Sequence, residues 1–300
     1  MLPDNSTKAL NRFLLFTAAF LFSTGGAAIK GCTLSSWQVA GFRSGIAAIT
    51  IWLLLPEARR GWTLRTFLIS VAYAATLVLF VLATRLTTSA NAVFLQATAP
   101  LYVLLLGPLL LHEPNRRADI VVMSAVAAGV VLLLTGYQQS FVTAPHPSRG
   151  NLLALATGFT WALTLTGLRW LGKTGGVESA GSVVVLGNAM AFAICLPMAV
   201  PVRHIDARDA GILLYLGIFQ VGVAYIALTR GIRHVPALEA ATLLLVEPVF
   251  NPIWAWLVHG ERPGYLALFG GACILAATFG GTWWHARHAP APMADSRSIE

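Results

Sequence analysis

Long apolar runs without charge are the feature that most limits how this chain can fold. Residues 86–111 form one such run, which contains no charged side chain. A run of about 18 or more apolar residues is long enough to cross a bilayer as a helix. Only 11% of the residues are charged and 57% are hydrophobic, and the mean hydropathy is +0.72. Because a soluble domain has roughly 25% charged residues to keep its surface wet, the sequence predicts a polytopic membrane protein.

We predict ten membrane-spanning helices, separated by short connections that hold most of the charges, prolines and glycines. The predicted ranges are 12–30, 36–55, 65–85, 88–111, 119–137, 150–171, 179–201, 208–230, 236–259 and 263–285. Residues 286–300 are rich in Ala, Pro and charge, which is typical of a disordered tail. Lys8 and Arg12 precede an apolar stretch, as in a signal peptide, but that stretch resembles a later span and we expect it to be retained.

Two stretches of the chain repeat each other. Pro100 lies inside an apolar run that closes at Glu113, and Pro248 lies inside a similar run that closes at Glu261. The prolines and the glutamates share one offset of about 148 residues, which indicates a duplicated unit. In the same way, the aromatic residues near Phe22 align with those near Trp161.

The repeat divides the chain into two units, 12–137 and 150–285, joined by a connection at 138–149. Each unit holds five predicted spans, and five is odd, so the second unit is expected to be inverted relative to the first. Lys and Arg are more frequent in the connections on the side that holds both termini, which places both termini in the cytoplasm. We therefore predict an all-α membrane protein with two inverted five-helix repeats around a central cavity.

Several of these features resemble the ten-span carriers of the drug/metabolite transporter superfamily, with EamA-type repeats at about 14–136 and 151–284. The matching residues are Phe-Leu-Phe-Ser-Thr at 20–24, Phe-Thr-Trp-Ala at 159–162, Phe42-Arg43, and the two Pro-to-Glu stretches. Within the superfamily the chain is most similar to YddG-type exporters of aromatic and other amino acids. Relatives of that type carry Trp before the proline of the fourth span, where this chain has Ala99, and Phe22 stands where they have another Trp.

Ten residues are candidates for a substrate cavity or for the hinges beside it. They are Phe22, Arg43, Tyr73, Gln96, Ala99, Pro100, Trp161, Tyr225, Glu247 and Pro248. Proline removes a backbone donor and clashes with the preceding turn, so each mid-span proline should bend its helix, either as a passive kink or as a hinge. Aromatic side chains suit a largely apolar ligand pocket, although facing lipid is the alternative for each of them.

Two charged side chains fall within predicted spans. A carboxylate such as Glu247 is costly at mid-membrane, so it should face a cavity, a partner or a proton. It could hold a substrate ammonium group, carry a coupled proton, or be a hydrogen-bonded structural acid. Arg43 lies between Gly41 and Gly45, which allow another helix to approach closely. It could bind a substrate carboxylate, or it could snorkel or pair internally. Glu113 and Glu261 are expected to cap helices or to form salt bridges in loops.

These patterns favour a secondary transporter that exports amino acids or related small metabolites across the inner (plasma) membrane by alternating access. A multidrug or nucleotide-linked metabolite transporter of the same fold is the alternative, and an intramembrane transferase or a channel is a more distant one. Cys32, Cys195 and Cys273 are scattered, and no His, Cys or acidic motif has metal or catalytic spacing, so we expect no catalytic residue, metal or cofactor. The expected partners are a small-molecule substrate and the lipid bilayer, without nucleic acid, and the protein is expected to be a monomer.

Overall fold

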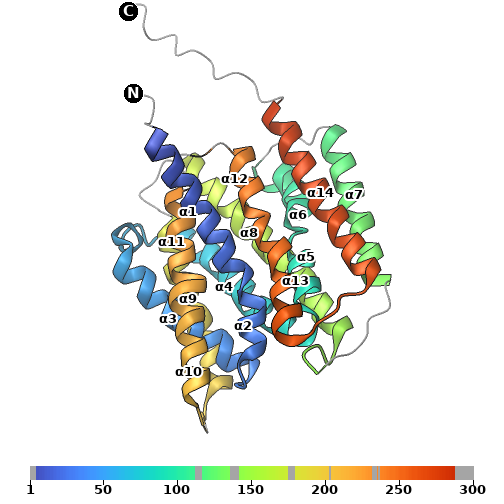
Figure 1. Cartoon of the computed structure of the whole chain (residues 1–300). Helices are drawn as coiled ribbons and strands as arrows, with labels where there is room; N and C mark the ends of the chain where they lie inside the picture. The colour runs from blue at the N-terminus through green and yellow to red at the C-terminus, as the bar shows by residue number, and fades with distance from the viewer. Residues whose placement is uncertain are drawn as a thin grey trace, which may run out of the picture.

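The computed structural model describes residues 5–111, 117–135, 142–174, 180–202, 204–231, 235 and 237–287. Every regular element within these ranges is a helix. Figure 1 shows the helices side by side in one bundle, with the start of α1 and the end of α14 at the same end of it. His112, Glu113, part of the 138–149 connection and the tail beyond residue 287 lie outside the described residues.

The elements follow in chain order. They are α1 (Asn5–Ser23), α2 (Gly25–Gly31), α3 (Ser36–Leu54), η1 (Pro56–Arg59), α4 (Leu64–Leu86), α5 (Ser89–Gln96), α6 (Ala99–Leu106), η2 (Gly107–Leu111), α7 (Arg117–Thr135), α8 (Pro147–Thr174), α9 (Ala180–Ala199), α10 (Ala207–Leu214), η3 (Tyr215–Val223), α11 (Ala224–Gly231), α12 (Ala237–Leu244), α13 (Val246–His259) and α14 (Tyr265–Arg287). The segments η2 and η3 are π-helical, and η1 is a 3₁₀ turn.

A helix occupies each of the ten predicted ranges. Within the described residues, seven helical stretches are long and apolar enough to cross a membrane. They are Ala9–Gly31, Leu64–Leu86, Ser89–Leu110, Pro147–Leu171, Ala180–Ala199, Ala207–Gly231 and Tyr265–Trp284. Helix α3, α7 and the α12–α13 pair do not combine the required length and hydropathy. Arg43 lowers the hydropathy of α3, and the apolar part of α7 is short, at Asp119–Thr135. The seven stretches support a multi-pass membrane protein, and the number ten remains a prediction.

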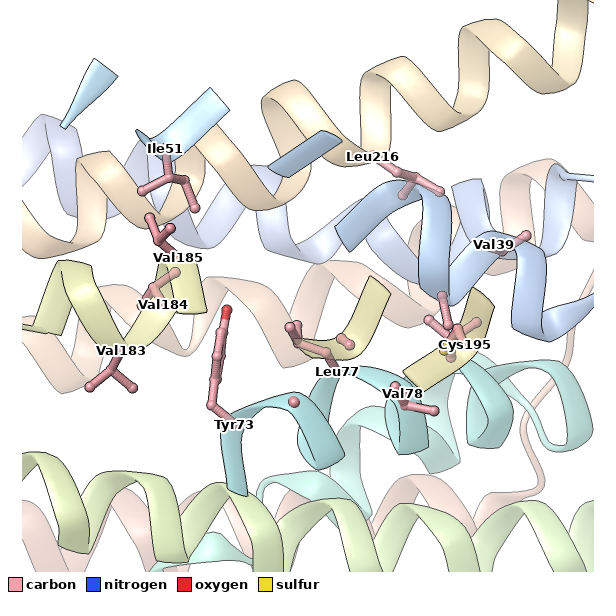
Figure 2. Close-up of a cluster of buried hydrophobic side chains, with 14 of the residues drawn as sticks. Val39, Ile51, Tyr73, Leu77, Val78, Val183, Val184, Val185, Cys195 and Leu216 are labelled. Atoms are coloured by element: carbon pink, nitrogen blue, oxygen red, sulfur yellow. The ribbon is translucent and has the colours of Figure 1, made fainter. Parts of the chain in front are cut away.

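The largest apolar core lies between α3, α4, α9 and η3. Figure 2 shows Val39 and Ile51 of α3, Tyr73, Leu77 and Val78 of α4, Val183, Val184, Val185 and Cys195 of α9, and Leu216 of η3 within it. A lipid bilayer supplies little hydrophobic drive for helices to associate, so close packing of such side chains is what holds neighbouring helices together.

Glycines allow the closest of these approaches. A Cβ atom placed on Gly41 would lie 2.9 Å from Cys195 Cβ, and one placed on Gly45 would lie 3.0 Å from the ring of Phe192. The prediction that this glycine pair admits a neighbouring helix is therefore confirmed, and the neighbour is α9. Gly129 of α7 and Gly270 of α14 meet in the same way, because a Cβ atom on either residue would lie within 2.8 Å of the other's carbonyl oxygen.

Candidate functional site

Two predicted spans that contain a proline are interrupted near their middle. The stretch α5–α6 breaks at Ala97 and Thr98, two residues before Pro100, and α12–α13 breaks at Leu245, three residues before Pro248. At both breaks the backbone forms i→i−3 hydrogen bonds: Thr98 N donates to Leu95 O at 3.3 Å, and Leu245 N to Thr242 O at 3.2 Å. Proline removes a donor and crowds the preceding turn, so the bends predicted at Pro100 and Pro248 agree with the structure.

A central cavity of about 220 Å³ lies beside these breaks. Its walls come from α1, α3, α4, α5, α8, η3, α11, α12 and α13. The lining residues are Phe22, Arg43, Thr76, Leu77, Phe80, Gln96, Trp161, Gln220, Val221, Tyr225, Leu228, Leu244 and Glu247. The lining is therefore mainly aromatic and aliphatic, with two charged side chains and a few uncharged polar ones, which is the usual composition of a small-molecule site.

Six of the ten predicted site residues line this cavity: Phe22, Arg43, Gln96, Trp161, Tyr225 and Glu247. Tyr73 does not line it, because its ring lies behind the wall with 1% of the residue exposed. The rings of Tyr73 and Tyr225 are 5.5 Å apart at an interplanar angle of 79°, and the Tyr225 ring lies 5.0 Å from that of Phe22. Tyr73 thus supports the aromatic wall from outside.

The remaining three candidates do not line this cavity. Ala99 is buried in the first turn of α6, and Pro248 is buried in α13, one residue and so about 100° around the helix from Glu247. Pro100 lies on a second cavity of about 360 Å³, together with Leu104, Leu165 and other residues of α6, α7, α8 and α14. All three stand near helix breaks, and their role as hinges remains a prediction.

Arg43 and Glu247 place opposite charges on the cavity wall. Arg43 is 2% exposed; its Nη2 donates to Leu77 O at 3.0 Å, and its Nε has no hydrogen-bond partner among the described residues. Glu247 is half-buried, and within the described part of the chain no cation lies within ion-pair distance of its carboxylate. Charged groups within a membrane protein need a partner or water, so both side chains have bonding capacity left for a ligand.

Seven lining residues were not among the ten candidates: Thr76, Leu77, Phe80, Gln220, Val221, Leu228 and Leu244. The internal repeat holds a signal that could have found some of them. Thr76 and Val221 have the same separation in the sequence as Phe80 and Tyr225, and Gln96 and Leu244 have the same separation as Pro100 and Pro248. Equivalent positions of the two repeats therefore contribute to one cavity.

Within the described residues, no group of three or more His, Cys, Asp or Glu side chains could hold a metal ion. The interrupted helices and the cavity with two opposite charges on its wall define a class: a helical membrane protein with a central cavity. The chain belongs to the EamA-like transporter family, because the model of that family matches residues 11–135 and again residues 148–282.

Named relatives are similar over most of their length. The pseudopaline exporter CntI of Pseudomonas aeruginosa is 27% identical over 274 residues, covering 88% of this chain and 93% of the relative. An uncharacterized transporter of Archaeoglobus fulgidus is 28% identical over 201 residues, covering 66% and 68%. A crystal structure with 19% identity has a TM-score of 0.60, covering 91% of this chain and 96% of its own, and it supports the fold alone. The protein is thus a transporter of this family rather than an enzyme.

Proposed function

We propose that the protein is a secondary transporter that exports amino acids or related small zwitterionic metabolites across the inner membrane by alternating access. The single observation that carries this proposal is the central cavity, on whose wall Arg43 and Glu247 stand with unused bonding capacity. A guanidinium group suits a carboxylate, and a carboxylate suits an ammonium group. A substrate that carries both groups would neutralise both charges at once.

The size of the cavity favours a small substrate. Pockets for drug-sized ligands are about 300–1,000 Å³. The central cavity, at about 220 Å³, is smaller than that range. Among the described residues, Arg43 is the one cation on its wall, which argues against a nucleotide-linked substrate, whose phosphates would call for several. The relative named as a pseudopaline exporter supports export as the direction of transport. Because of that relative, substrates other than amino acids should also be tested.

We further propose ten spans in two inverted repeats, 12–137 and 150–285, in a monomer with both termini in the cytoplasm. The two ranges matched by the family model and the paired lining positions support the division. The start of α1 and the end of α14 lie at the same end of the bundle (Figure 1). A chain that starts and finishes on one side of a membrane crosses it an even number of times, so this placement supports ten spans.

The packing of the fourth predicted span supports an inward-facing conformation. All of the α5 residues from Ser89 to Leu95 are buried, whereas in α6 only Ala99 is. Leu243, Leu244 and Leu245 around the end of α12 are likewise only half-buried. Within this span the α5 half is therefore more closely packed than the α6 half, which is at the end proposed to face the cytoplasm.

Counterflow in proteoliposomes tests this function. Vesicles that contain the purified protein are loaded with one unlabelled amino acid, and the uptake of a labelled one is followed with and without a pH gradient. Exchange that is saturable and absent from protein-free vesicles is the expected result. Exchange without pH dependence would indicate a facilitative exporter, and acceleration by the gradient would indicate proton coupling. If no amino acid exchanges, the amino-acid assignment is wrong, and drugs and nucleotide-linked metabolites become the next substrates to test.

A further inference from the structure

The short helix α2 is set off from α1 by a break at Thr24. Thr24 Oγ1 bonds Leu21 O at 2.7 Å and the Tyr215 hydroxyl at 2.8 Å, so the break is held by a side chain of another element. Figure 1 places α2 at the end of the bundle opposite to the start of α1. A change in the backbone at Thr24 could therefore move α2 while α1 stays in place.

The first two residues of α2 press their backbone against three polar side chains. A Cβ atom on Gly25 would lie 2.5 Å from Gln220 Nε2. A Cβ atom on Gly26 would lie 2.4 Å from Ser89 Oγ and 2.7 Å from Asn251 Oδ1. Only glycine permits such an approach, and it offers CH₂ groups, which satisfy no hydrogen bond. The three side chains come from η3, α5 and α13, and they meet at the first turn of α2.

These polar side chains are buried without adequate partners. Ser89 is 1% exposed and Asn251 is 0% exposed. Within the described residues, Ser89 Oγ, both amide atoms of Asn251 and Gln220 Oε1 have no hydrogen-bond partner. Buried polar groups are nearly always bonded, because leaving one unpaired is unfavourable. Several such groups beneath one helix have bonding capacity that becomes available to other partners when α2 moves away.

The same three side chains meet the start of α2 and come from elements that also line the central cavity. Gln220 lines the cavity itself. Asn251 lies four residues after Glu247 on α13, and positions i and i+4 share one face of a helix. Ser89 begins α5, whose last residue, Gln96, lines the cavity. A polar track therefore leads from the cavity to the underside of α2.

A buried ion pair holds α2 over this track. Lys30 Nζ lies 2.6 Å from Glu261 Oε1, donates to Thr87 O at 2.7 Å, and also donates to Thr143 O. Glu261 accepts from the Thr143 hydroxyl at 2.8 Å and from Ser89 N at 2.9 Å. Lys30 is near the end of α2, so this network joins it to the start of α5 and to the connection between the repeats. We call these five residues the Lys30 network.

We propose that α2 is the gate at this end of the transport path, hinged at Thr24 and closed by the Lys30 network. We propose also that Gln220, Asn251 and Ser89 are the residues that hydrogen-bond the substrate's polar groups when α2 moves away. This inference rests on the proposed transport function, but its first test does not require a substrate. The gate opens when the Lys30–Glu261 pair separates, and the polar track then connects the cavity to the far side of the membrane.

Accessibility of a cysteine at position 89 tests the gate directly. Ser89→Cys is introduced into full-length protein in which Cys32, Cys195 and Cys273 are alanine, and a hydrophilic thiol reagent is applied to the purified protein in detergent. The matched control is Ala90→Cys, which is on the same helix and 1% exposed, but packed in the apolar cluster that includes Ile274. With the Lys30 network intact, both cysteines should react slowly.

Breaking the Lys30 network is expected to make the two cysteines react at different rates. In a Lys30→Met background, Ser89→Cys is expected to react roughly tenfold faster or more, because a buried pair that loses one partner no longer favours the closed state. Ala90→Cys should remain slow. Glu261→Gln provides a second route to the same opening if Lys30→Met fails to fold. If Ser89→Cys reacts no faster than Ala90→Cys in either folded variant, the gate proposal is wrong.

Transport then tests the polar track. With an amino acid that shows counterflow, Asn251→Ala should lower the exchange rate roughly fivefold or more. The matched control is Asn188→Ala, at a buried asparagine of α9 that bonds Val184 O at 2.9 Å and does not line the cavity. Equal rates for the two variants would remove Asn251 from the path. If no amino acid exchanges while Ser89→Cys opens as expected, the gate stands and the substrate assignment fails.

Discussion

Lys30 and Glu261 form an ion pair of 2.6 Å in which both side chains are 1% exposed. Arg12 and Glu239 join α1 to α12 near the other end, but there the side chains are 55% and 32% exposed. The buried pair has its remaining hydrogen bonds satisfied within the protein, whereas the exposed pair competes with water. The two ends of the bundle are therefore closed with different strengths, which fits a conformation that is shut at the α2 end.

Removing one partner of each pair should reveal this difference. Losing one side of a buried pair costs about 3–5 kcal/mol, and an exposed pair contributes about 0–1 kcal/mol. Lys30→Met should therefore lower the free energy of unfolding, measured by SDS titration with circular dichroism, far more than Arg12→Met. The double variant Lys30→Met/Glu261→Leu should recover much of the loss, because no buried charge is left unpaired. Equal losses at the two ends would contradict this prediction.

Glu247 is expected to act on the substrate ammonium group. A tenfold change in affinity corresponds to about 1.4 kcal/mol, which is within the range of a single charge-assisted hydrogen bond. Glu247→Gln should therefore raise the KM for amino-acid exchange about tenfold or more. Glu239→Gln removes the same charge from a residue that pairs with Arg12 and does not line the cavity, and it should change KM less than about twofold. Wild-type exchange by Glu247→Gln at every pH would exclude both the substrate role and the proton role of Glu247.

Features that depend on local backbone chemistry could be predicted from the sequence. Pro100 and Pro248 bend their helices wherever the chain goes, and the repeat indicated that they are equivalent. The family resemblance supplied the placement of Phe22 and Trp161 on the cavity wall. Glu261 was correctly expected in a salt bridge, whereas Glu113 lies outside the described residues.

Features that depend on contacts between distant segments could not be predicted. Lys30 reads as an ordinary loop cation until the fold brings Glu261 beside it. The break at Thr24 has no proline and depends on Tyr215, which is far away in the sequence. Ala99 was chosen because relatives carry Trp at this position, but Ala99 is buried and does not line the cavity. Periodicity gives the face of a helix, and only packing shows what that face contacts.

Trp161 should limit the size of the substrates that enter the central cavity. Trp161→Ala would enlarge the cavity without removing a charge, so larger amino acids should compete several-fold better for exchange. Trp170→Ala is the control, because Trp170 is on the same helix but 37% exposed, with the Arg65 guanidinium 4.9 Å from its ring. The measurement is a competition series with amino acids of increasing size. An unchanged size preference in Trp161→Ala would remove this residue from the substrate site.

Gly26 should tolerate no side chain while α2 is closed. An added methyl group would lie 2.4 Å from Ser89 Oγ and 2.7 Å from Asn251 Oδ1, both of which are buried. Overpacking of this kind costs about 1–3 kcal/mol. Gly26→Ala should therefore lower the free energy of unfolding of the closed state and increase the labelling of a cysteine at position 89. Gly280→Ala is the matched control, because nothing lies within 4 Å of a Cβ atom there. Alanine at an open helical position is favoured over glycine by about 0.5–1 kcal/mol, so this variant should be neutral or more stable. If Gly26→Ala were as stable as Gly280→Ala and left position 89 protected, α2 could not be packed on Ser89 and Asn251 in the resting protein.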